Sequence, residues 1–219
     1  MSEATERLIA ELATGLKPVR RIASPWVRAG LFLAVVGIAG ALLSMHANLP
    51  AIGARLTAAP DMWLAVVGSV ATTALAAIAA CMVSVPGRSW RWAWLPAPGV
   101  ALWLGASGLG CLRTTALGLW RPAIMADAMH ECMPFILRGS VLLAVPMALL
   151  LWWARPLRPA LVASLGGLAV AGGAASLLWL FHPYDASAED LLVHTVAVLM
   201  VIGACRLLAG LAAHRRTRR

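Results

Sequence analysis

Long runs of apolar residues, almost free of Asp, Glu, Lys and Arg, recur along the chain. Six of them are about 20 residues long, which is the length that an α-helix needs to cross the hydrocarbon core of a membrane. They cover residues 29–47, 62–85, 92–112, 133–153, 159–181 and 191–211. Only Arg138 and Arg206 interrupt them, each near an end of its run, where a long side chain can reach the headgroups. The pattern predicts an all-α integral membrane protein, with a bundle of six transmembrane helices over residues 29–211.

The charged residues are few and unevenly distributed. They make up 12% of the chain, about half of what a soluble domain carries, while 61% of the chain is hydrophobic. Of the 18 Lys and Arg residues, all but four, namely Arg55, Arg113, Arg121 and Arg138, fall on one side of the predicted membrane, together with the basic tail at 212–219. Because short cytoplasmic loops retain basic residues, we expect both termini to be cytoplasmic. The net charge of +9 then reflects membrane topology in a lipid bilayer, and no direct nucleic-acid binding is expected.

Residues 1–28 precede the first span and are too few to fold alone. Within them, apolar residues recur at helical spacing, at Leu8, Ile9, Leu12 and Leu16, and acidic residues occupy the opposite face. This pattern predicts a short cytoplasmic N-terminal amphipathic helix. Its apolar stripe fits either the bilayer interface or a protein groove, and the glutamates among the first 11 residues favour the protein.

Small residues recur at helical spacing in two of the spans. The first span carries Gly30, Ala34, Gly37, Ala41 and Ser44, and the fifth carries Gly166, Ala169, Gly173 and Ser176. Small side chains let helix backbones approach each other closely in a membrane. We therefore predict that both of these faces pack against neighbouring helices.

Four cysteines are too few for a disulfide scaffold, but two of them are expected at similar depth on the external side. Cys111 ends the third span and Cys132 directly precedes the fourth, and an external loop over residues 113–132 joins them. Histidines are expected on the same side: His130 lies in this loop, His182 follows the fifth span and His194 lies about one turn inside the sixth.

Two kinds of chemistry fit these residues. Two thiols in an oxidising compartment can form a disulfide, and thiolates with imidazoles can bind a soft metal such as zinc or cadmium. We predict a redox or metal sensor made of Cys111, Cys132, His182 and His194. The candidate metal ligands are Cys111, His130, Cys132 and His182. A structural disulfide and two unpaired interfacial cysteines are the alternatives, and no cofactor is expected beyond transient binding of a heavy metal.

The sequence carries none of the common catalytic motifs. It lacks G-x-S-x-G, H-E-x-x-H, Walker A and any C-x-x-C pair. Ionisable residues are also scarce inside the spans, whereas ion and proton transporters need them there. We therefore expect no enzymatic activity. An envelope thiol oxidoreductase or a small metal transporter is the alternative function, and the pair Cys111 and Cys132 is its only support.

Several segments together resemble the NrsF family of membrane regulators. They are Leu8-Ile9 with Leu12, the run Leu16-Lys17-Pro18-Val19-Arg20-Arg21, Pro25-Trp26, the six spans, Cys132, His182-Pro183-Tyr184-Asp185 and Asp190-Leu191-Leu192-Val193-His194. The resemblance covers essentially the whole chain. It implies a multi-pass protein of the bacterial inner membrane that negatively regulates an extracytoplasmic-function sigma factor, sigma-F.

The resemblance implies, more specifically, a membrane anti-sigma factor. Its cytoplasmic N-terminal segment would hold the sigma factor, and envelope cysteines would sense an oxidant or a heavy metal and trigger release. The residues expected to bind the partner are Leu8, Leu12, Leu16, Arg20 and Arg21. Cys132 matches one family cysteine. A second cysteine of some relatives falls just after the fifth span, where this chain has His182, and Cys111 is the candidate for the missing thiol.

Overall fold

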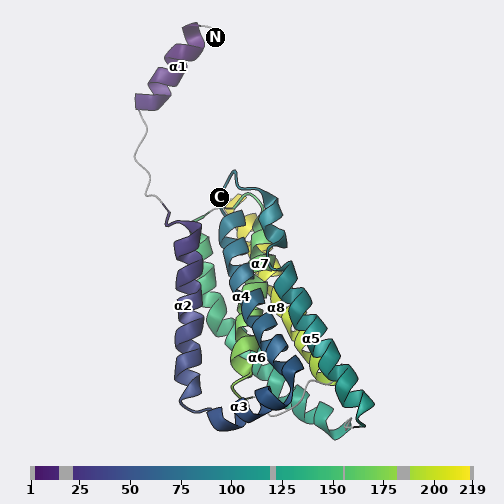
Figure 1. Ribbon diagram of the computed structural model, residues 1–219. Helices are drawn as coiled ribbons and strands as arrows, with labels where there is room; N and C mark the ends of the chain where they lie inside the picture. Colours follow the sequence, from purple (N-terminus) through teal and green to yellow (C-terminus); the bar gives the residue numbers. More distant parts are fainter. Residues whose placement is uncertain (1–2, 15–21, 119–121, 155, 182–187, 218–219) are drawn as a thin grey trace.

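The computed structural model in Figure 1 describes residues 3–14, 22–118, 122–154, 156–181 and 188–217. These residues form α-helices and one 3₁₀ helix, and they contain no β-strand. The α-helices are α1 (Glu3–Thr14), α2 (Pro25–Ser44), α3 (Leu49–Ala58), α4 (Pro60–Val83), α5 (Ala97–Ala116), α6 (Pro122–Trp152), α7 (Pro159–Leu178) and α8 (Ala188–Thr217). The 3₁₀ helix is η1 (Trp90–Trp94) and leads into α5.

Six helical stretches are long and apolar enough to cross a membrane, so the predicted all-α fold and its six spans are confirmed and the chain is a multi-pass membrane protein. The stretches are Pro25–Ser44, Asp61–Val83, Trp90–Arg113, Glu131–Trp152, Pro159–Leu178 and Asp190–Ala212. Consecutive spans run in opposite directions, which places the start of α2 and the end of α8 at the same end of the bundle (Figure 1). We call it the arginine-rich end, because the element bounds place there the described arginines at 28, 88, 91 and 158 and, in the last part of α8, those at 206 and 215.

Two connections differ from the sequence prediction. Residues 113–132, expected as an external loop, are mostly helical, because α5 continues to Ala116 and α6 begins at Pro122. The connection between the first two spans contains α3, whose first turn is capped by the Asn48 side chain accepting a hydrogen bond from the Ala51 N–H. In both places helices extend past the apolar runs, since polar residues are tolerated in helices outside the hydrocarbon.

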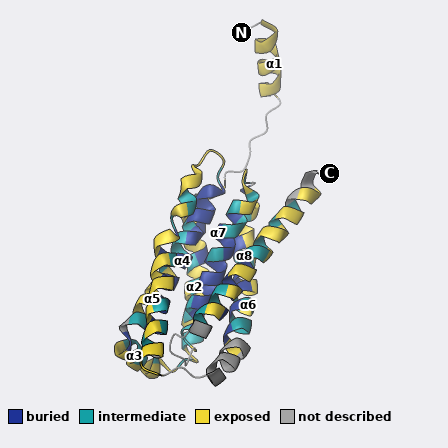
Figure 2. Cartoon of the chain, turned by 90° about the vertical axis from the view of Figure 1, so that its right-hand side faces the viewer, coloured by how far each residue is buried: buried dark blue, intermediate teal, exposed yellow. Residues whose placement is uncertain are grey.

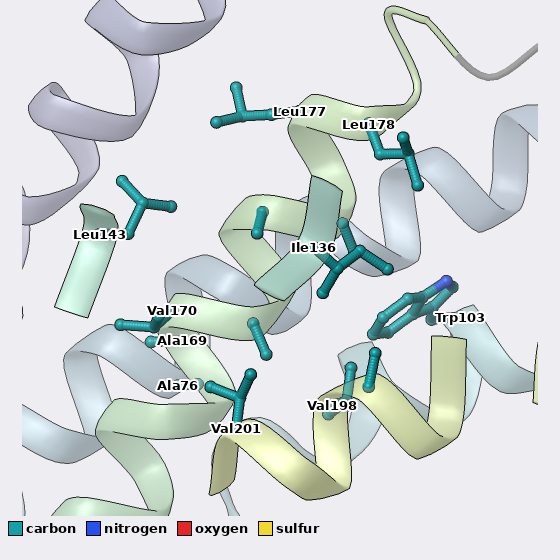
Figure 3. Close-up of a cluster of buried hydrophobic side chains, with 14 of the residues drawn as sticks. Ala76, Trp103, Ile136, Leu143, Ala169, Val170, Leu177, Leu178, Val198 and Val201 are labelled. Atoms are coloured by element: carbon teal, nitrogen blue, oxygen red, sulfur yellow. The ribbon is translucent and has the colours of Figure 1, made fainter. Parts of the chain in front are cut away.

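The centre of the bundle is formed by α4 and α7. They are the most buried spans, at 61% and 67% of their apolar windows, against 33% or less for the other four. Figure 2 shows the buried residues running along α7 and the adjoining side of α4. Side chains from α4, α5, α6, α7 and α8 meet in one apolar cluster, which Figure 3 shows around Ile136 and Val170.

Close backbone contacts hold α4 against both of its main neighbours. A Cβ on Gly68 would lie 2.5 Å from the Trp103 backbone nitrogen of α5, and one on Gly172 of α7 would lie 2.9 Å from the Thr73 hydroxyl. Between α7 and α4, the Ser176 hydroxyl also donates a hydrogen bond to the Ser69 hydroxyl at 3.1 Å. Side chains at these glycines would force the helices apart.

The small-residue prediction is right for one span and wrong for the other. In α7, Gly166, Ala169 and Gly173 are buried, as predicted. In α2, by contrast, Gly30, Ala34, Gly37 and Ala41 are exposed on the surface of the chain. The buried residues of α2 all lie in its first two turns, so this helix is attached to the bundle mainly at the arginine-rich end.

Arg28 makes this attachment. The residue is 3% exposed, and Nη1 donates to the Ser84 hydroxyl at 3.1 Å and to the Leu150 carbonyl at 3.2 Å. Nη2 donates to the Cys81 carbonyl at 3.2 Å, which also accepts from the Ser84 hydroxyl at 2.7 Å. Cys81 and Leu150 belong to the last turns of α4 and α6, where carbonyls lack backbone partners within their own helix. One side chain of α2 therefore caps the ends of two other helices.

We expect Gly68→Ala to lower the free energy of unfolding in detergent micelles by about 1–3 kcal/mol, because the new Cβ overlaps the α5 backbone. Gly105→Ala is the control, since no atom lies within 4 Å of its added Cβ and alanine favours a helix. Unfolding by titration with sodium dodecyl sulfate, followed by circular dichroism, measures both variants. Equal stability of the two would contradict the close approach of α4 and α5.

We expect Arg28→Met to lower the free energy of unfolding by about 2 kcal/mol or more, because it removes the donor to the Leu150 carbonyl and to the Ser84 hydroxyl and one of two donors to the Cys81 carbonyl. Arg28→Lys should fall between this variant and the wild type, since one ammonium group lacks the fork of a guanidinium. Arg91→Met, at an exposed position of the same end, is the control. The same titration applies, and wild-type stability of Arg28→Met would refute the capping role.

Candidate functional site

Cys132 lies about three turns inside α6, at the start of the span Glu131–Trp152 and on the side opposite the arginine-rich end. Its side chain is 2% exposed and belongs to the main apolar cluster, one turn before the fully buried Ile136. Glu131 precedes Cys132 in the chain, and Asp190 stands on the first turn of α8, which packs against α6. A thiol in this place is shielded from bulk water.

Asp190 and His194 form a pair on the first turns of α8, which packs against α6. His194 Nδ1 lies 3.1 Å from Asp190 Oδ1 and 2.8 Å from the Asp190 backbone carbonyl. Both side chains are largely buried, at 12% and 14% exposure. Two oxygens around Nδ1 favour a proton on that nitrogen. Histidines that bind metals are commonly oriented by a carboxylate in this way.

Cys111 is placed differently from Cys132. It is partly exposed in the last two turns of α5, and the Thr115 hydroxyl donates to its carbonyl at 2.9 Å. The helix α5 packs mainly on α4, and α6 on α7 and α8, while α8 contacts both α5 and α6. The structure holds the described cysteines as thiols. Joint use of Cys111 and Cys132 therefore stays a prediction.

Several predicted site residues cannot be placed. His182, Leu16, Arg20 and Arg21 lie outside the described residues, and His130 falls within α6 at a position whose side chain is not described. Within the described part of the chain, no group of three or more His, Cys, Asp or Glu side chains is arranged to hold a metal ion. The described part of the predicted sensor is thus Cys111, Cys132 and His194, with Asp190 and Glu131 as groups that the prediction did not include.

At the N-terminus, every residue of α1 is exposed. Leu8 and Leu12 are 54% and 64% exposed, and Ile9 is also exposed. An ion pair of Arg7 with Glu3 at 2.8 Å spans one turn of this helix, but such an exposed pair contributes little stability. Three large apolar side chains on one short helix are therefore available for contact with another surface.

Arg28 is the charged residue that sequence reasoning missed, because by its position it is simply one of the basic residues flanking the first span. A local signal was present. Ser24 followed by Pro25 is a helix start, with the serine at the N-cap and proline in the first turn, and the Ser24 hydroxyl does accept a hydrogen bond from the Val27 N–H. A helix that starts there places Arg28 one turn inside it.

A known protein family matches nearly the whole chain. The profile of the NrsF family, described as negative regulator of sigma F, matches residues 12–213. No curated protein matches the chain. No solved structure matches it. With a family match that includes all six spans, both described cysteines of the predicted sensor and His194, the chain belongs to the NrsF family, whose members are negative regulators of the sigma factor sigma-F.

Proposed function

We propose that this protein is a membrane-bound anti-sigma factor that sequesters an extracytoplasmic-function sigma factor at the bacterial inner membrane and releases it on an envelope signal. The observation that carries the proposal is the family match over residues 12–213. Both termini face the cytoplasm in this proposal, because the arginine-rich end then obeys the preference of basic residues for that side. The opposite end, with Cys132, faces the envelope.

The exposed helix α1 is the proposed contact with the sigma factor. Leu8, Ile9 and Leu12 lie on one face, whereas Glu6 and Ala10 lie on the other. A helix of 12 residues is marginal on its own, so a partner that covers its apolar face would stabilise it. Docking of such a face in a protein groove is a common mode of peptide recognition. Leu16, Arg20 and Arg21 extend the proposed contact along the chain.

The proposed sensor is the group around Cys132. A thiolate and an imidazole are ligands for soft metal ions such as cadmium, and His194, whose ring Asp190 orients, is the proposed imidazole ligand. Cys111 and His182 are the proposed further ligands. An oxidant would act on the same thiols by forming a disulfide between Cys132 and Cys111, each losing one proton and one electron to the oxidant.

The helix α6 connects the two proposed functional ends. Cys132 stands at the start of its membrane span, and the Leu150 carbonyl near the end of the helix accepts a hydrogen bond from Arg28. Arg28 follows directly on the segment that carries α1. A small shift of α6 caused by metal or disulfide at Cys132 would therefore act on the base of the N-terminal segment, as packed helices can move by about one to two ångströms in switching proteins.

The α1 contact predicts that Leu8→Glu with Leu12→Glu abolishes binding of the sigma factor, since two charges would then face an apolar groove. Ala10→Glu with Thr14→Glu is the matched control, because it adds the same charges at the same spacing on the opposite face of α1. Co-purification of the full-length protein with the sigma factor encoded beside its gene gives the measurement. Unchanged binding by the Leu8 and Leu12 variant would exclude α1 as the contact.

The sensor predicts that Cys132→Ser sharply reduces induction of a sigma-F-dependent reporter by cadmium and by an oxidant. Asp190→Asn should raise the cadmium concentration needed for induction by about 10–100-fold, because it removes the carboxylate that orients His194, while the oxidant response changes little. Cys205→Ser, in the part of α8 near the arginine-rich end, is the control. Full induction in Cys132→Ser, Cys111→Ser and the double variant would rule out thiol sensing.

A further inference from the structure

A cavity of about 270 Å³ lies at the arginine-rich end of the bundle. Two segments line it: residues 83 and 85–90, which lead from the end of α4 into η1, and residues 157–158, which precede α7. Its volume is roughly twenty times what one buried water needs and just below the usual range of small-molecule pockets. The space therefore suits a polyatomic group about the size of a lipid headgroup.

The polar side chains of this cavity are dominated by two arginines. Arg88 comes from the first segment and Arg158 from the second, both are exposed, and no ion pair among the described residues involves either of them. The lining contains no acidic residue. Two guanidinium groups at one cavity without an acidic partner favour an anionic ligand, and their planar donors match the oxygens of a phosphate group.

The backbone of the first segment is suited to this role. Gly87 has φ +83°, a left-handed conformation that glycine adopts without strain, and the Arg88 N–H donates to the Val85 carbonyl at 3.2 Å. The turn that carries Arg88 is thus closed by its own hydrogen bond. The arginine side chain remains available to a ligand.

The rim of the cavity is apolar. Leu157 is 78% exposed and Trp90 is 48% exposed, and both line the same space as the arginines. The cavity lies where the spans end, at the depth where indoles and the headgroups of lipids meet. A ligand that fits both parts has an anionic head and an apolar tail.

We propose that this cavity binds the phosphate headgroup of an anionic phospholipid from the surrounding leaflet. Arg88 and Arg158 bind the phosphate oxygens, and the acyl chains extend along Leu157 into the bilayer. The lipid is favoured over a free phosphate ion because the exposed Leu157 and Trp90 give the ion nothing to bind. Basic pockets on the cytoplasmic side of membrane bundles commonly hold such headgroups. The assignment does not depend on regulation of a sigma factor.

Native mass spectrometry of the full-length protein in detergent, with added palmitoyl-oleoyl phosphatidylglycerol, tests the proposal. We expect one tightly bound phosphatidylglycerol, about 5-fold weaker binding for Arg88→Gln or Arg158→Gln and about 25-fold weaker binding for both together. Arg91→Gln with Arg215→Gln is the matched control, since both residues are exposed at the same end but do not line the cavity. This control should bind like the wild type.

The other arms separate the possible ligands. Palmitoyl-oleoyl phosphatidylcholine should bind much more weakly than phosphatidylglycerol, and inorganic phosphate should not compete. Displacement of the lipid by inorganic phosphate, equal binding of phosphatidylcholine, or unchanged binding by the double glutamine variant would each overturn the proposal. Circular dichroism checks that this variant is folded. If it is not, Arg88→Lys with Arg158→Lys replaces it, and this variant must bind more weakly than the wild type because it loses the bidentate donors.

Discussion

The burial of the Arg28 guanidinium determines how the first span joins the rest of the bundle. A charged residue with 3% exposure is costly to bury unless its donors are used, and here the two terminal nitrogens serve one hydroxyl and two carbonyls, while the buried Nε has no partner among the described residues. Those carbonyls belong to helix ends, which carry partial negative charge, so the arginine is stabilised by α4 and α6 although it stands in the first turns of its own helix. The contacts of Arg28 therefore join the start of α2 to the ends of α4 and α6.

Away from Arg28, the packing of the helices depends mainly on how closely their surfaces fit together. The hydroxyls of Thr72 and Thr73 donate to carbonyls of their own helix four residues earlier, so they require no partner from a neighbouring span. Glycines then allow α4 to approach α5 and α7 at backbone distance. At the opposite end α4 and α5 are also joined by the Arg113 and Asp61 ion pair at 3.3 Å. Among the described residues of the spans, the buried arginine and the ion pairs thus lie toward the two ends of the bundle.

The sequence was sufficient to predict the six spans, because apolar runs of membrane length are rare in soluble proteins. It was less informative about helix ends: the polar residues at 113–132 suggest a loop, although helices continue outside the hydrocarbon. The stripe containing Gly30 and Gly37 shows why spacing alone cannot identify a packed face, since the same spacing occurs on the exposed side of α2.

The candidate site was only partly accessible to prediction as well. The Asp190 and His194 pair has the spacing of one helical turn and could have been recognised from the chain alone. The burial of Cys132 and the capping by Arg28 depend on which helices are neighbours, and no local pattern reports that. The sequence also could not show that Cys111 and Cys132 stand on helices with different main neighbours, α4 for α5 and α7 for α6.

The long sequence separation of the Arg28 contacts bears on the order in which the protein assembles during synthesis. The Cys81 carbonyl lies 53 residues after Arg28 and the Leu150 carbonyl 122 residues after it. At ribosomal rates of about 5–20 residues per second, the second acceptor is made roughly 6–24 s after the arginine. During that interval α2 can already lie in the lipid while its arginine stays among the headgroups. The joint between the N-terminal segment and the bundle would then be among the last to close, after the fourth span has been inserted.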